Sequence, residues 1–86
     1  MPIARYLTRF EETWSWRARA ACRGADPTLF FKPDNEPRAR AAHRERLAKQ
    51  ICHTCPVMLA CRSHSVHAGE SHGIWGGLTA IERRGL

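Results

Sequence analysis

Residues 51–61 read ICHTCPVMLAC and hold three of the four cysteines of this 86-residue chain, Cys52, Cys55 and Cys61. Pro56 interrupts the stretch, so we expect one helix to end near Cys52 and another to begin after the proline. A Cys-x-x-Cys pair at such a junction places two thiols close together, and Cys61 lies on the first turns of the next helix. The stretch therefore predicts a corner between two helices that carries three thiols.

The fourth cysteine, Cys22, lies far upstream and completes a C-x29-C-x2-C-x5-C pattern. Four thiolates suit either a tetrahedral zinc ion or a [4Fe-4S] cluster. Zinc ribbons use two short cysteine pairs, which the isolated Cys22 and the five-residue gap before Cys61 do not reproduce, so the spacing favours the cluster. A dithiol redox role for Cys52 and Cys55 would lack the βαβ context of thioredoxin-like proteins.

Apolar residues are too few for a large core. Ile, Leu, Val and Phe account for 15 of the 86 residues, and one core in so small a domain supplies only ~3–5 kcal/mol. We therefore expect the four cysteines to supply the cross-link that stabilises the fold. The first twelve residues carry four charges and no apolar run typical of a signal peptide, and no later stretch approaches ~20 apolar residues. We expect a cytoplasmic protein, in which cysteines serve as metal or cluster ligands rather than disulfides.

The chain is predicted to form one domain, residues 1–86, with residues 1–10 as a flexible N-terminal arm. Helical segments are expected over 11–21, 26–31, 37–52, 57–68 and 79–86. Asp26 can cap a helical turn that starts at Pro27, and Thr79 with Glu82 matches a capping box. No alternating strand pattern is present. The predicted fold class is all-α, a small bundle of short helices organised around the four-cysteine site.

The net charge of +6, from twelve arginines and two lysines against eight acidic residues, suits an acidic partner. With a 2+ cluster on four thiolates the charge would fall to about +4. Candidate phosphate contacts lie on the outer face of the long predicted helix and near the C-terminus: Arg38, Arg40, Arg46, Lys49, Arg83 and Arg84. A solvated helix face would have the same composition. No catalytic triad or carboxylate pair is present, so we expect neither an enzyme nor a small-molecule substrate.

Four motifs extend the cysteine pattern: ACRGADP at 21–27, LFF at 29–31, ICHTCPV at 51–57 and GIWGGLT at 73–79. Together they resemble the WhiB-like family, small iron–sulfur transcriptional regulators of actinobacteria and some of their phages. The resemblance covers about residues 14–84, and the four cysteines joined to GIWGG form a highly specific combination. The run 64–70 and the arginine-rich stretch before Cys52 look closest to the WhiD-type branch.

This resemblance implies a [4Fe-4S] cluster on Cys22, Cys52, Cys55 and Cys61 that is sensitive to nitric oxide and oxygen. It also implies that a monomer with its cluster binds region 4 of the principal sigma factor in a 1:1 complex. The family's aromatic partner-binding set falls, by position, on Trp16, Phe30, Phe31 and Trp75. Aromatic side chains on a small rigid platform suit an interface. The alternative role of these aromatic residues, above all of Phe30, is to cover the cluster and fill a sparse core.

Many family members continue beyond the last helix with a basic tail that is thought to reach DNA, whereas this sequence stops at Leu86. We therefore expect DNA contact to be weak or indirect, through phosphates and within a sigma complex. Two alternatives to a cluster-dependent regulator stay open from the sequence. One is a disulfide reductase that uses the Cys52 and Cys55 dithiol in the apo-protein, and the other is a zinc-stapled binding module.

Overall fold

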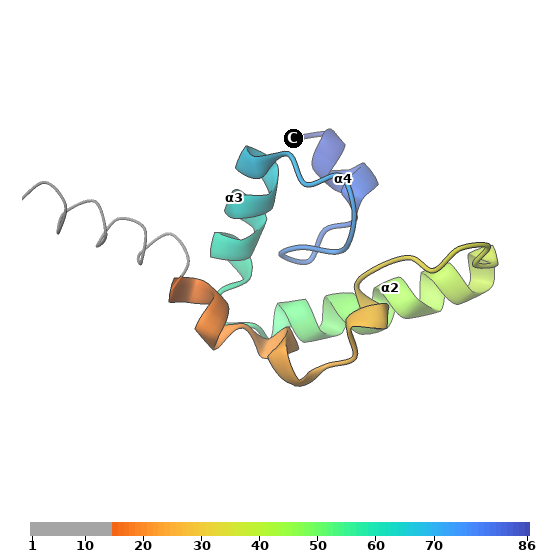
Figure 1. Ribbon diagram of the computed structural model, residues 1–86, viewed down its shortest axis with the longest axis horizontal. Coiled ribbons are helices and arrows are strands. Elements are labelled where there is room, and N and C mark those ends of the chain that lie inside the picture. The colour runs from red at the N-terminus through yellow and green to blue at the C-terminus, as the bar shows by residue number, and fades with distance from the viewer. Residues whose placement is uncertain (1–14) are drawn as a thin grey trace, which may run out of the picture.

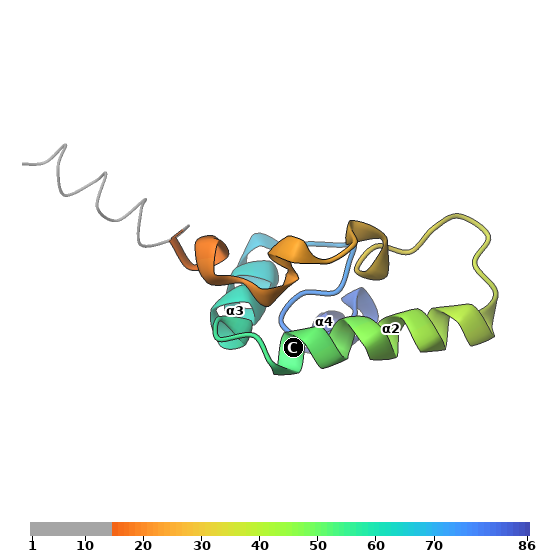
Figure 2. The ribbon, with the colours of Figure 1, turned by 90° about the horizontal axis from the view of Figure 1, so that it is seen from below.

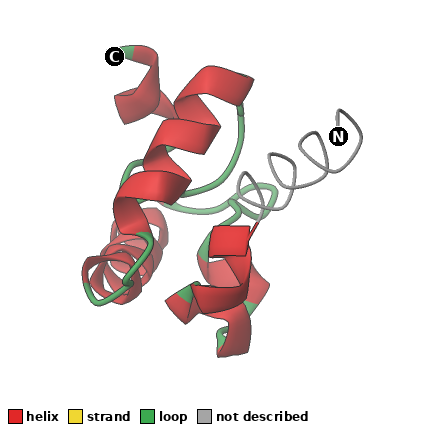
Figure 3. Ribbon diagram, turned by 90° about the vertical axis from the view of Figure 1, so that its left-hand side faces the viewer, coloured by secondary structure: helices red, strands yellow, loops and turns green. Residues whose placement is uncertain are grey.

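The computed structural model describes residues 15–86, and within them the chain is mostly helical without a strand (Figure 3). Trp75 and Leu78 form an isolated antiparallel bridge in that part of the chain. The predicted arm, residues 1–10, and the first part of the predicted helix 11–21 lie outside the described residues. The expected all-α class agrees with this architecture. None of the described helices is long and apolar enough to cross a bilayer.

Within residues 15–86 the elements follow one another as three short 3-10 helices and three α-helices. They are η1 (Trp16–Arg19), η2 (Ala21–Gly24), η3 (Pro27–Leu29), α2 (Arg38–His53), α3 (Met58–Ala68) and α4 (Ala80–Arg84). One prediction is corrected here, because the described part of the segment expected as one helix through Ala21 is broken. Ala20 has an extended backbone, with φ −68° and ψ 132°, so the chain changes direction just before Cys22.

The predicted helix ends are confirmed by their capping contacts. The Asp26 carboxylate accepts a hydrogen bond from the Thr28 backbone amide at 3.0 Å, with Pro27 at the first position of η3. At α4, Glu82 Oε1 accepts from the Thr79 amide at 2.8 Å and Thr79 Oγ1 accepts from the Glu82 amide at 3.2 Å. Gly69 ends α3 in the left-handed region at φ 68°. Local sequence chemistry therefore fixes these ends.

The helices frame a central loop. In Figure 1, α2 runs along the bottom of the molecule, α3 rises at one end, and the chain between α3 and α4 returns toward the centre. The 3-10 segments run alongside α2, as Figure 2 shows from below, and they contact it through η2 and η3, while η1 contacts α3. The small core consists of Phe30, Ala48, Cys52 and Ile74. A cysteine in so small a core agrees with the expectation that the thiols supplement it.

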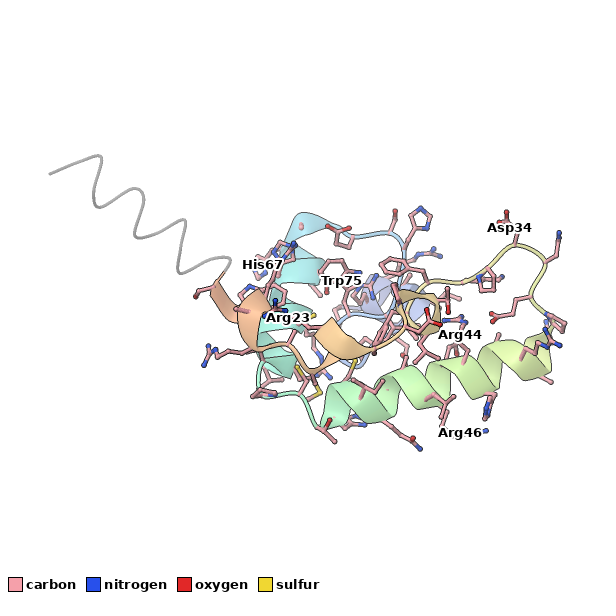
Figure 4. The ribbon with its side chains drawn as sticks, turned by 60° about the horizontal axis from the view of Figure 1, so that its bottom comes forward. Arg23, Asp34, Arg44, Arg46, His67 and Trp75 are labelled. Carbon is pink, nitrogen blue, oxygen red and sulfur yellow. The ribbon has the colours of Figure 1, made fainter. Side chains whose placement is uncertain are left out.

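A buried ion pair attaches the N-terminal segment to α2. Arg44 Nε donates to both oxygens of Glu36, at 2.8 and 3.1 Å, and Nη1 donates to the Leu29 carbonyl at 2.9 Å. The two side chains are only 11% and 4% exposed. Figure 4 shows Arg44 directed toward the linker between η3 and α2, which holds Glu36, whereas Arg46 points away from it. Arg44 therefore connects three parts of the chain: α2, the linker and η3.

Replacing Glu36 by Ala should lower the free energy of unfolding by about 3 kcal/mol, because a buried guanidinium then loses its carboxylate. Urea denaturation followed by far-UV circular dichroism measures the change. The control is Asp34→Ala, which removes an exposed carboxylate from the same linker and should change stability by less than ~0.5 kcal/mol. Equal effects of the two substitutions would contradict the structural role of the ion pair.

Candidate metal centre

All four cysteines line one cavity of about 360 Å³. Cys22 comes from η2, Cys52 from the end of α2, Cys55 from the junction and Cys61 from α3. All four are free thiols. The remaining wall is largely apolar and aromatic, and includes Ile51, Met58 and Ile74. The structure thus brings together the four residues that the sequence predicted as ligands, from segments up to 39 positions apart in the sequence.

Burial and mutual repulsion disfavour four thiolates without a counter-charge. Burial raises the pKa of the Cys61 thiol to about 11, and negative charge on Cys52, Cys22 and Cys55 adds to the effect. Burial also raises the pKa of Cys52, with contributions from Cys22 and Cys55. Each of these two thiolates therefore interacts with the other cysteines across the cavity. A bound cationic centre would remove this cost.

Backbone amides face the sulfurs from two sides of the cavity. The Ala21 amide donates to Cys55 Sγ at 3.4 Å. The Gly76 amide acts on Cys61 and the Gly77 amide on Cys52, and each lowers the pKa of its thiol against the larger effect of burial. Hydrogen bonds to ligating sulfurs tune both the stability and the potential of a metal centre. Cys55 accepts such a bond from Ala21, and the GIWGG turn brings two further amides near Cys52 and Cys61.

The donor set suits a metal centre held by thiolates. Four thiolates bind either a tetrahedral zinc ion, with Zn–S bonds of ~2.3 Å, or a [4Fe-4S] cluster. The four cysteines line a cavity of about 360 Å³, which leaves room for such a group among them. The residues present therefore fit a cysteine-ligated metal centre.

The same features disfavour the dithiol alternative. A disulfide reductase needs an accessible thiol with a low pKa. Cys52 is buried, and its pKa is raised above the ordinary value. The Cys52 and Cys55 pair is thus better suited to holding a metal centre than to attacking a disulfide.

The GIWGG turn packs directly against α3. Gly76 has φ 58°, and a Cβ there would overlap the backbone and Cβ of Arg62. Arg62 Nε donates to the Gly76 carbonyl at 2.9 Å and holds the turn in place. Gly77 has φ 79° and lies over the Cys52 Cβ. Glycine is therefore required at Gly76 both for its backbone conformation and for its contact.

The predicted aromatic set divides into two pairs. Trp16 and Phe30 are only 8% and 7% exposed, so the unbound chain buries both. Phe30 packs in the core and Trp16 lies against His64, which favours for both residues the role of filling the core and covering the cavity. Phe31 is 48% exposed. Trp75 is half-buried and donates its indole N–H to the His72 carbonyl at 3.0 Å.

His64 is a residue that the sequence did not single out. Its ring lies between two indoles, with centroid distances of 5.6 Å to Trp16 and 5.7 Å to Trp75. These tilted ring contacts link η1, α3 and the GIWGG turn beside the cavity, which both tryptophans line. In Figure 4 the Trp75 side chain lies within the space framed by these elements. Sequence alone offered one signal only, since His64 is three residues after Cys61 and hence on nearly the same face of α3.

The residues predicted as phosphate contacts differ in their exposure and in their partners. Arg38, Arg40 and Arg46 are exposed on α2, and Arg84 is exposed on α4. Lys49 instead pairs with Glu82 at 2.8 Å, which connects α2 to α4. Arg83 is 6% exposed and donates to backbone carbonyls, so the expectation of a surface phosphate contact at this residue is wrong.

A small helical domain with four thiols around one cavity defines a class of cysteine-ligated metalloprotein, and comparison with known proteins identifies its family. The family model "Transcription factor WhiB" matches residues 16–86. The chain therefore belongs to the WhiB family, as its motifs predicted.

The relatives carry several names within this family. The redox-responsive transcriptional regulator WhiB3 of Mycolicibacterium smegmatis is 49% identical over 72 residues, covering 84% of this chain and 75% of the relative. The transcriptional regulator WhiD of Streptomyces coelicolor is 45% identical over 75 residues, covering 87% and 67%. The transcriptional regulator WhiB1 of Mycobacterium tuberculosis is 42% identical over 71 residues, covering 83% and 82%. Similarity thus extends beyond the WhiD-type branch.

Gly76→Ala should lower the free energy of unfolding by about 2 kcal/mol or more, since the added Cβ overlaps α3 at a left-handed backbone position. Denaturant unfolding of the metal-free protein measures the loss. Gly24→Ala is the matched control, because it lies two residues after a cysteine and a Cβ there meets nothing within 4 Å. A Gly76→Ala protein as stable as the Gly24→Ala protein would contradict the close packing of the turn.

In the metal-free protein at pH 8, iodoacetamide should modify the exposed Cys22 first and Cys61 much later. A thiol with a pKa of about 11 is only about 0.1% thiolate at that pH. Raising the pH toward 11 should accelerate the modification of Cys61. Peptide mapping by mass spectrometry over a time course reads each site separately, and equal rates for the two cysteines at pH 8 would show that Cys61 is not buried in solution.

Proposed function

We propose that this chain is a transcriptional regulator that holds a [4Fe-4S] cluster on Cys22, Cys52, Cys55 and Cys61. With the cluster bound, it binds region 4 of the principal sigma factor in a 1:1 complex. One observation carries this proposal: four thiols from separate segments line one cavity, and the same cavity is bordered by the exposed Phe31 and the half-buried Trp75. A metal site and an aromatic surface are therefore adjacent.

When bound, such a cluster supplies a redox-active centre that nitric oxide or oxygen can attack. The cysteines of the chain act as a cross-link, because they tie η2 to the α2–α3 corner. The described core is small, so loss of the cross-link should loosen the N-terminal segment. If the partner binds only the ordered form, cluster binding and partner binding stabilise each other by linkage. The redox response in the relatives' names is consistent with such a sensor.

The partner surface is proposed around Phe31 and Trp75. The Phe31 ring covers Gly73, the first glycine of the turn that carries Trp75. Trp16 and Phe30 are buried and line the same cavity, so they belong to the base of this surface. Exposed aromatic anchors on a rigid base are typical of binding hot spots.

Any DNA contact is proposed for the outer face of α2, where Arg38, Arg40 and Arg46 are exposed. Lys49 and Arg83 are excluded from that surface by their contacts with Glu82 and with backbone carbonyls. Contacts of this kind position a protein on phosphates without reading bases, and their strength falls with added salt.

The decisive experiment is anaerobic purification of the chain, alone and co-expressed with sigma region 4. We expect a brown protein with four iron and four sulfide per chain that co-elutes with sigma. Ala substitution of any one of the four cysteines should abolish both the colour and the complex. A colourless protein with one zinc per chain would contradict the proposal and favour the zinc-stapled module.

Trp75→Ala and Phe31→Ala should each weaken sigma binding by about 30-fold, the loss of a ~2 kcal/mol hot spot, while the iron content stays at four per chain. Calorimetric titration of the anaerobic protein measures the affinity. The control is Leu59→Ala, which removes an apolar side chain that is 67% exposed on α3 and does not line the cavity. If all three variants bind sigma alike, the surface lies elsewhere.

A further inference from the structure

Arg83 is the most densely hydrogen-bonded side chain of the described residues. Nη1 donates to the carbonyls of Gly73 and Leu78, both at 2.8 Å. Nη2 donates to the carbonyls of Glu70 and His72, at 3.0 and 3.1 Å. One guanidinium therefore holds the loop between α3 and α4 at both of its ends. The planar guanidinium has donors at fixed positions that reach several carbonyls at once, whereas the single ammonium of a lysine cannot reproduce these bonds.

The loop that Arg83 holds is the one that faces the metal centre. Gly76 lines the cavity together with the four cysteines, and a Cβ at Gly77 would lie 3.8 Å from the Cys52 Cβ. Gly76 also lies against Arg62, the residue next to Cys61, so the loop has little freedom to approach from another direction. The position of both glycines beside the cysteines therefore depends on the shape of the backbone between Gly73 and Leu78.

The same contacts reach the partner-facing side. The His72 carbonyl accepts hydrogen bonds from both Arg83 Nη2 and the Trp75 indole, at 3.1 and 3.0 Å. The orientation of Trp75 and the position of Arg83 thus share one acceptor. The Ile74 amide also donates to the Phe30 carbonyl at 2.8 Å, which ties the loop to the segment that carries Phe31.

The charge of Arg83 is buried without a carboxylate partner. None of the ion pairs in residues 15–86 includes Arg83, and its Nε is buried without a hydrogen-bond partner there. Burying a charge in this way is unfavourable unless nearby negative charge offsets it. Burial lowers the pKa of Arg83, and negative charge on Cys61 and Glu70 acts against this effect.

We propose that Arg83 is a positioning residue of the metal centre, which fixes the Gly73–Leu78 backbone so that Gly76 and Gly77 lie beside Cys61 and Cys52 and Trp75 faces the partner. This rests on the proposed function for the cluster and the partner, but the action of Arg83 on the loop does not depend on either. The hydrogen bonds of Arg83 end on backbone carbonyls of the loop, so Arg83 acts through the backbone.

Three variants distinguish the planar hydrogen-bonding geometry of the guanidinium from its charge. Arg83→Lys keeps the charge and loses that geometry, whereas Arg83→Gln loses both. Arg84→Gln removes the exposed neighbouring charge as a control. The first measurement is hydrogen–deuterium exchange of the metal-free proteins, which requires neither cluster nor partner. We expect faster exchange over residues 70–78 in both Arg83 variants, with α2 and α3 unchanged. Wild-type exchange of that loop in Arg83→Lys would overturn the proposal.

The second measurement is made on the anaerobic proteins after reconstitution with iron and sulfide, in the absence of DNA. Visible circular dichroism reports the surroundings of the cluster, and the decay of its absorbance in air reports its lifetime. We expect both Arg83 variants to change the visible spectrum and to lose the cluster about tenfold faster than Arg84→Gln, since altered hydrogen bonding around ligands costs 10–100-fold. An Arg83→Lys protein with the wild-type spectrum and lifetime would overturn the positioning role.

The two measurements also distinguish the failure of this proposal from that of the proposed function. If the wild-type protein takes up no iron, the function fails while the exchange data still decide the role of Arg83 in the loop. If Arg83→Gln does not fold, the comparison of Arg83→Lys with wild type and Arg84→Gln remains, because the lysine variant keeps the charge and the size of the side chain.

Discussion

The structure depends on one constraint, which is that four thiols from separate segments must surround a single cavity. Cys22 reaches it only because the chain breaks at Ala20, and Cys52, Cys55 and Cys61 reach it because Pro56 separates two helices. Without a metal, burial and mutual repulsion raise the pKa values of Cys52 and Cys61, so these thiols stay protonated near neutral pH. A cationic metal core would stabilise the thiolates and turn the four residues into a cross-link for a chain with a small core.

The arginines that make this chain basic are partly structural. Arg44, Arg62 and Arg83 each donate to backbone carbonyls of segments distant in sequence, namely Leu29, Gly76 and the 70–78 loop. Loops without regular structure leave carbonyls unpaired, and a guanidinium can satisfy several of them at once. The net charge of +6 therefore overstates the charge that the surface offers to a nucleic acid.

Much of the architecture could be predicted because its signals are local. The Pro37 start of α2, the Gly69 stop and the Thr79–Glu82 capping box each depend on neighbouring residues, and the cysteine spacing predicted four residues that line one cavity. The choice between Arg83 and Arg84 could not be predicted, because the carbonyls that bind Arg83 lie 5 to 13 positions upstream in an irregular loop. The sequence left the burial of Trp16 and Phe30 open for a related reason, since 3-10 turns give no periodicity that marks an inner face.

The cysteine site and the proposed partner surface share contacts in a molecule this small. Trp16 lies six positions before Cys22 and packs against His64, which packs against Trp75. Trp75 in turn shares the His72 carbonyl with Arg83, whose loop faces Cys52 and Cys61. The N-terminal segment therefore reaches Trp75 through His64, and the C-terminal helix reaches it through the His72 carbonyl. Under the proposed function, release of the cysteines would loosen the segment that carries Trp16, and this short chain of contacts would carry the change to the partner surface.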